Sequence, residues 1–95
     1  KAQIGGLYRT KVQSVSANIN VIGKVLDDAV IEVDKYLDDA FMAGLKEVTV
    51  IHGRGAGILR EGLSKMMKGH KHVKSQRKGS YNEGGDGVTI VTLNR

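Results

Sequence analysis

The sequence contains no cysteine and no tryptophan, and it has few other aromatic residues. Without cysteine, disulfide bonds, thiolate zinc sites and a cysteine nucleophile are excluded. The absence of disulfides fits a reducing compartment, so we expect a cytoplasmic protein. Three tyrosines and one phenylalanine are too few for a nucleic-acid surface built from stacked aromatic rings.

Long apolar runs are also missing. No stretch approaches the length of a membrane-spanning helix, and residues 1–10 lack the apolar segment of a secretory signal. We therefore expect no membrane partner. The chain does not begin with methionine, which predicts a piece of a longer protein. Its 95 residues suffice for one domain with a modest core.

Charge is abundant and unevenly distributed. Residues 24–47 carry seven acidic and three basic side chains, whereas residues 52–78 carry eight Lys/Arg and one acid. Separated charge of this kind predicts an electropositive face for a polyanion such as nucleic acid; a solvated basic face is the alternative. The basic side chains expected to follow a nucleic-acid strand are Arg60, Lys65, Lys68, Lys74, Arg77 and Lys78.

Hydrophobic periodicity predicts a flexible arm over residues 1–17 and one domain over residues 18–95. Apolar residues at three- and four-residue steps, such as Leu26, Val33 and Leu37, predict the first helix. The expected strands and helices cover residues 19–23, 25–43, 47–52, 58–68, 73–78 and 88–93.

The order βαβαββ predicts an α/β fold of the α+β two-layer sandwich type, in which a mixed four-stranded sheet packs against two helices. The strand at 47–52 is almost continuously apolar. This composition predicts a central strand covered on both faces.

The most informative segment is Ile-His-Gly-Arg-Gly-Ala-Gly at residues 51–57, between a strand and a helix. Gly53, Gly55 and Gly57 lack Cβ atoms, so their backbone amides can approach an anion at a helix start. Arg54 can add a bidentate fork for phosphate. The segment lacks the Lys-Ser/Thr ending of a nucleotide-binding loop. It therefore predicts a phosphate cradle; a tight turn without a ligand is the alternative.

Three histidines invite chemical interpretation. His52 follows the strand at the edge where α/β sheets bind ligands, and it suits a general acid or base; a histidine that caps the backbone is the alternative. His70 and His72 have metal-ligand spacing, but no neighbouring residue in the sequence supplies two further ligands. We therefore expect no metal site. Residues 82–87 predict a plain hairpin loop, or a loop that brings Glu83 and Asp86 to the nucleic acid.

Four segments together resemble the small MutS-related (Smr) nuclease domain. They are residues 19–23, residues 34–40 of the acidic helix, the turn at 51–57 and the Glu-Gly-Gly-Asp-Gly tail at 83–87 with the strand that follows it. The match runs from residue 19 to residue 93, and it is most similar to the carboxyl-terminal Smr domain of the second bacterial MutS family.

The resemblance implies a βαβαββ fold similar to the carboxyl-terminal domain of translation initiation factor three. It also implies binding of DNA, including branched DNA, or of RNA and the ribosome, and a nicking endonuclease activity. Parent proteins of this type act in suppression of recombination or in ribosome rescue. ATP and oligomerisation are expected only in such a parent. The domain itself is expected to hold no cofactor, and a divalent cation, Mg²⁺ or Mn²⁺, is compatible with cleavage.

One motif departs from the family. Its first motif usually reads Leu-Asp-Leu-His/Arg-Gly, whereas this chain has Asn20 at the acidic position and Ile22 at the basic position. The first hypothesis is a sequence-nonspecific nicking endonuclease with His52, Asn20 and Arg54 as catalytic residues. The second is a binding module without cleavage, which Asn20 and Ile22 favour. The third is a protein-interaction domain that uses the acidic helix face.

Overall fold

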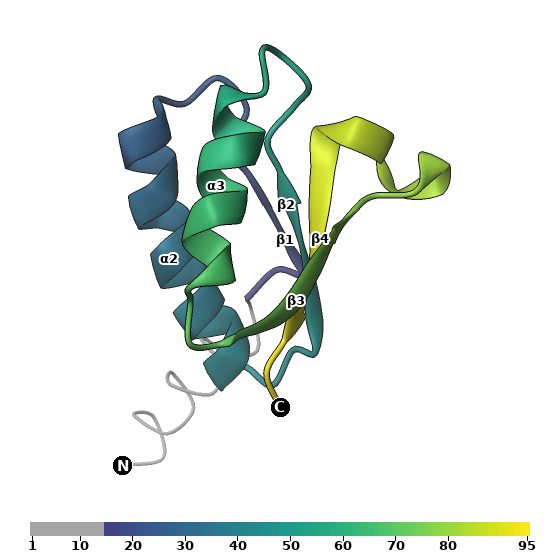
Figure 1. Ribbon diagram of the computed structural model, residues 1–95. Coiled ribbons are helices and arrows are strands. Elements are labelled where there is room, and N and C mark those ends of the chain that lie inside the picture. The colour runs from purple at the N-terminus through teal and green to yellow at the C-terminus, as the bar shows by residue number, and fades with distance from the viewer. Residues whose placement is uncertain (1–14) are drawn as a thin grey trace.

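The computed structural model describes residues 15–95 and contains two helices and four strands in the expected order (Figure 1). Most of the expected 1–17 arm therefore lies outside the described residues. The elements are β1 (Asn18–Asn20), α2 (Leu26–Met42), β2 (Glu47–Ile51), α3 (Ile58–Lys68), β3 (Val73–Lys78) and β4 (Val88–Leu93). Two 3-10 turns, Tyr81–Glu83 and Gly85–Gly87, lie between β3 and β4.

The four strands form one mixed sheet in the order β1-β2-β4-β3. β1 pairs in parallel with β2, and β4 pairs antiparallel with both β2 and β3. The last strand therefore inserts between β2 and β3 and becomes a central strand. This topology confirms the predicted two-layer sandwich of a mixed sheet and two helices.

Both helices cover the same face of the sheet (Figure 1). Val48 and Val50 of β2 are buried in the core under them, whereas Glu47 on the opposite face is exposed. The expectation that β2 is covered on both faces is therefore wrong. The strand is central because it lies between β1 and β4, and its alternating burial reflects a sheet with one helix-covered face.

The core lies between the sheet and the two helices. Its fully buried large side chains include Leu37 from α2, Leu63 and Met67 from α3, and Val91 and Leu93 from β4. Because α2 places one apolar residue per turn on this face, the stripe predicted from the sequence is the buried one. Within the described part of the chain, neither helix is long and apolar enough to cross a membrane.

The β3–β4 connection is fixed by a charged pair. The Arg77 guanidinium donates to both carboxylate oxygens of Glu83 at 2.7 and 2.9 Å, and the Ser80 amide donates to Glu83 at 2.8 Å. These hydrogen bonds lower the pKa of Glu83 to about 2, and the one from Arg77 has the largest effect. The carboxylate form of Glu83 therefore orders the loop.

We expect the contribution of Glu83 to stability to be lost in acid. Its folded pKa of about 2 lies below the ordinary value of 4.5, so the stabilisation is complete above that value and disappears as the pH falls toward 2. Thermal denaturation should show Glu83→Gln less stable than the wild type at pH 7 and equal to it at pH 2. Glu61→Gln is the control, since Glu61 lies 4.0 Å from its basic neighbour. An equal difference at both pH values would contradict the assignment.

Candidate nucleic-acid interface

The turn between β2 and α3 is a backbone concavity at the amino end of a helix. Gly53, Gly55 and Gly57 have φ values of +79°, +32° and +85°, a region that favours glycine. Gly57 is the N-cap of α3 and provides no side chain to cap the first amides of the helix. The small pocket here is about 240 Å³ and includes residues 52–60 in its lining.

The amides of this turn divide into two groups. Those of His52 and Gly53 donate to the Gly87 carbonyl at 3.1 and 2.9 Å. The next four, at residues 54–57, donate to no backbone carbonyl of residues 15–95. Amides grouped at a helix start in this way attract an anion. The 82–87 segment is thus more than a plain hairpin loop, because Gly87 anchors the turn, a role that sequence reasoning missed.

Two arginines flank the turn. Arg54 lies across the glycine-rich tail: a Cβ on Gly85 would be 3.4 Å from an Arg54 guanidinium nitrogen. Arg60 folds back onto the helix start, where a Cβ on Gly57 would be 3.0 Å from its guanidinium. The cradle defined by residues 53–57 therefore combines backbone amides with two permanent positive charges. The pocket lining among the described residues includes no carboxylate, although a Cβ on Gly57 would lie 3.6 Å from Glu61 Oε2. One carboxylate beside two guanidinium groups does not fit Mg²⁺ or Mn²⁺, which several acidic side chains usually hold.

His52 is buried, and both of its ring nitrogens are engaged. Nδ1 lies 2.8 Å from the Gly53 carbonyl, which can only accept, so Nδ1 carries the proton. Nε2 lies 2.9 Å from the Thr89 hydroxyl, which donates to it when the ring is neutral. His52 therefore joins the cradle to β4. Its general acid-base role stays a prediction, and any proton would pass through Thr89, which the sequence did not single out.

The two positions that depart from the family motif lie beside the cradle. The Asn20 side chain accepts a hydrogen bond from the Ile22 amide at 2.9 Å and so fixes the turn after β1. Ile22 is 56% exposed and covers Gly53, where a Cβ would lie 3.3 Å from its side chain. Asn20 thus acts on the backbone, and Ile22 adds an apolar wall to the pocket.

A basic groove continues from the cradle between α3 and β3. It measures about 780 Å³, and Arg60 and Thr89 belong to its lining. The predicted basic residues in the groove are Arg60, Lys65, Lys68, Arg77 and Lys78. Three of them already face acids: Arg77 binds Glu83, Lys78 lies 3.3 Å from Asp86, and Arg60 lies 4.0 Å from Glu61.

Charge available for a phosphate strand therefore comes mainly from the α3 side of this groove. Lys74, the sixth residue of the predicted set, is absent from the groove lining. Glu83 and Asp86 pair with Arg77 and Lys78 of β3 and offset their positive charge. Contact of these two acids with nucleic acid stays a prediction.

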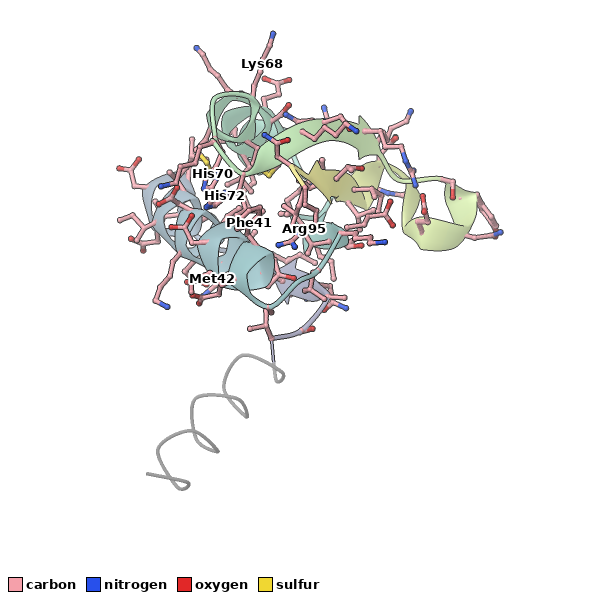
Figure 2. All side chains as sticks on the ribbon, turned by 90° about the horizontal axis from the view of Figure 1, so that it is seen from below. Phe41, Met42, Lys68, His70, His72 and Arg95 are labelled. Carbon is pink, nitrogen blue, oxygen red and sulfur yellow. The ribbon has the colours of Figure 1, made fainter. Side chains whose placement is uncertain are left out.

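The expectation that His70 and His72 lack further ligands is wrong. His70 Nε2 lies 3.1 Å from Asp34 Oδ1 and 3.6 Å from Asp38 Oδ1, and His72 Nε2 also lies 3.6 Å from Asp38 Oδ1. The aspartates come from α2, one turn apart and more than thirty residues earlier in the chain. Sequence proximity could not reveal this cluster, because the packing of α2 beside α3 creates it (Figure 2).

The fold and the turn define a class: a two-layer α/β domain with a glycine-rich turn between a strand and a helix. The chain belongs to the Smr domain family, whose model matches residues 19–94. This membership confirms the family resemblance found in the sequence.

Similar proteins include Endonuclease MutS2 of Caldanaerobacter subterraneus subsp. tengcongensis, 58% identical over 83 residues, or 87% of this chain and 10% of that protein. Endonuclease MutS2 of Alkaliphilus oremlandii is 52% identical over 93 residues, or 98% of this chain and 12% of that protein. The chain thus spans about a tenth of the length of these relatives.

Two solved structures share the fold. The Smr domain of Thermus thermophilus MutS2 has a TM-score of 0.80 and 33% identity, over 82% of this chain and 98% of that one. YdaL, a stand-alone small MutS-related protein of Escherichia coli, has a TM-score of 0.79 over 83% of this chain and 65% of that one. At 22% identity, the second similarity shows the fold alone.

Proposed function

We propose that this domain binds the sugar-phosphate backbone of DNA without sequence preference and cleaves one strand, as the nicking domain of a longer endonuclease. The observation that carries the proposal is the cradle, with four amides at residues 54–57 that donate to no backbone carbonyl of the described chain. The family and the name of the MutS2 relatives support the endonuclease part. In a longer protein, the domain would act on recombination intermediates or on ribosome-bound RNA.

Binding would use the cradle for one phosphate and the α3 side of the groove for the next ones. Arg54 and the backbone of Gly53, Gly55 and Gly57 would hold the first phosphate, since a guanidinium and backbone amides both match its oxygens. Lys65 and Lys68 would follow the strand. Contacts to phosphate carry no sequence information, which is why no sequence preference is expected.

Cleavage would use His52 through Thr89, with Asn20 holding the turn beside them. A Thr hydroxyl 2.9 Å from a histidine nitrogen, with the other nitrogen bonded to the Gly53 carbonyl, has the order of a hydroxyl, a base and an orienting group. Water attacking the phosphorus would pass its proton to Thr89 Oγ1 while Thr89 passes its own to His52 Nε2. The P–O bond to one strand end would break, and the leaving oxygen would take a proton from solvent. Arg54 would stabilise the charge that develops on the phosphate.

A nicking assay with a hydroxyl deletion tests this proposal. Supercoiled plasmid is incubated with the wild type, Thr89→Val and Thr92→Val in Mg²⁺ or Mn²⁺, with a chelated control. Thr92 is on the same strand and half-buried. Thr92→Val therefore removes the same hydroxyl group at a position outside the groove lining and serves as the matched control. We expect Thr89→Val to slow nicking by roughly 100-fold or more while it retains plasmid binding. Equal nicking by Thr89→Val and the wild type would remove His52 and Thr89 from the mechanism.

The second candidate is a binding module that docks a larger protein onto nucleic acid without cutting it. Asn20 favours this function, because an amide cannot accept a proton as a carboxylate does. Its hydrogen bond from the Ile22 amide supports a structural role at the turn after β1. In the same assay, wild-type protein that retards the plasmid in a gel and produces no open circles would establish this function. Asn20→Asp then tests whether the family's acid restores nicking.

A further inference from the structure

We infer that Asp34, Asp38 and His70 form a binding site for one divalent transition-metal ion of the zinc type. The site lies between α2 and the turn from α3 to β3, where Figure 2 shows His70 and His72 near Phe41 and Arg95. It is separated from the cradle by the length of α3, about 16 Å for its eleven residues. The site is therefore distinct from the cradle and does not depend on the proposed cleavage.

The donor atoms have the separations of ligands around one ion. Asp34, Asp38 and His70 each offer an atom within 4.8 Å of the other two. Ligands at 2.0–2.1 Å from a tetrahedral Zn²⁺ lie about 3.3–3.4 Å from one another. The contacts of 3.1 Å from His70 Nε2 to Asp34 Oδ1 and of 3.6 Å from His70 Nε2 to Asp38 Oδ1 bracket that value.

Asp38 Oδ1 supplies an independent observation. This oxygen is buried and has no hydrogen-bond partner among residues 15–95. The two imidazole nitrogens that face it lie 3.6 Å away, which is too far for a hydrogen bond. A buried carboxylate oxygen without a hydrogen-bond partner requires a compensating group, and a cation shared with Asp34 and His70 provides it.

The imidazoles are held in place before any ion binds. The His70 side chain is only 5% exposed. The His72 ring stacks on Phe41 with centroids 3.9 Å apart and an interplanar angle of 9°. The Arg95 guanidinium lies over the Phe41 ring, 4.4 Å from its centroid. Fixed ligands reduce the entropy that a metal must overcome. An imidazole nitrogen beside two carboxylate oxygens favours Zn²⁺, Co²⁺ or Ni²⁺ over Mg²⁺, which prefers a shell made of oxygen alone.

Metal binding has one structural consequence at His70. Its Nδ1 now accepts a hydrogen bond from the His72 amide at 3.1 Å, so the neutral ring carries its proton on Nε2. Coordination through Nε2 moves that proton to Nδ1 and replaces the amide hydrogen bond. The NMR resonance of the His72 amide should therefore shift when the ion binds, together with those of the two imidazole rings.

Metal titration of tag-free protein, first treated with a chelator, tests the inference. Calorimetry with Zn²⁺ and absorption spectra with Co²⁺ should show one ion per chain, and Zn²⁺ should raise the melting temperature while Mg²⁺ leaves it unchanged. Asp38→Asn should weaken Zn²⁺ binding by at least about tenfold. Its matched control is Asp39→Asn, the same change one residue along α2, where Asp39 pairs with Lys35 at 3.0 Å.

Two results would overturn the inference: no Zn²⁺ binding by the wild type, or equal Zn²⁺ affinity in Asp38→Asn and Asp39→Asn. His70→Gln, which removes the imidazole of the proposed site, provides a second variant with the same expected loss. Circular dichroism of each variant checks that the fold is retained, so a lost site is distinguished from an unfolded chain.

Discussion

Replacing Arg54 by alanine should lower the affinity of this domain for DNA by roughly 10- to 100-fold, and by the same factor for every sequence. A hydrogen bond between charged groups is worth about 1.5–3 kcal/mol, and each 1.4 kcal/mol is about a tenfold change in affinity. The Arg54 side chain lies against Gly85 and Gly87, beside the amides at residues 54–57, which donate to no backbone carbonyl in the described part of the chain. Its loss removes the side-chain ligand of the cradle and leaves the backbone intact.

Fluorescence anisotropy with three labelled duplexes of unrelated sequence measures this effect. Lys74→Ala is the control for charge, because Lys74 is basic and exposed but absent from the groove lining. It should cost much less than Arg54→Ala. A loss confined to one duplex would mean that Arg54 reads a base, and equal losses for the two variants would mean that only net charge matters.

Replacing Leu37 by alanine should reduce the free energy of unfolding by about 2–5 kcal/mol. Leu37 is fully buried in the core, where it packs with Val33 and Leu63. For a domain of this size, that loss corresponds to a fall in melting temperature of roughly 10 °C or more.

Urea denaturation compares Leu37→Ala with Ile31→Ala on the same helix. Ile31 is 69% exposed, so its replacement should change stability by about 0.5 kcal/mol or less. Similar losses for the two variants would show that α2 does not bury the face assigned to it.

The sequence predicts much of this fold because the decisive signals are local. The stripe that contains Leu37 has helical period, and the bounds expected for α3, β3 and β4 agree with the structure. The sequence does not predict which faces of β2 are buried. Its apolar composition is typical of a strand between two layers, but Thr49 and Ile51 point to the face that carries no helix and are only half-buried there.

Part of the candidate site can likewise be predicted from the sequence, and part cannot. The glycines at 53, 55 and 57 predict the cradle from the sequence, because glycine is the residue that readily adopts the positive φ values found there. The partners of the cradle come from β4 and the segment before it: Thr89 bonded to His52, and Gly87 bonded to the backbone of the turn. The cluster of Asp34, Asp38 and His70 likewise unites residues far apart in the chain. Only the folded arrangement brings such groups together.

The salt dependence of DNA affinity tests the central claim, that the cradle and groove bind the phosphate backbone, most directly. If Arg54, Arg60, Lys65 and Lys68 each neutralise one phosphate, the logarithm of the binding constant should fall with the logarithm of salt concentration with a slope of roughly −3 to −4. Arg54→Ala should make the slope shallower by about 1. Affinity that is weak and insensitive to salt would contradict backbone binding and leave the cradle as a turn without a ligand.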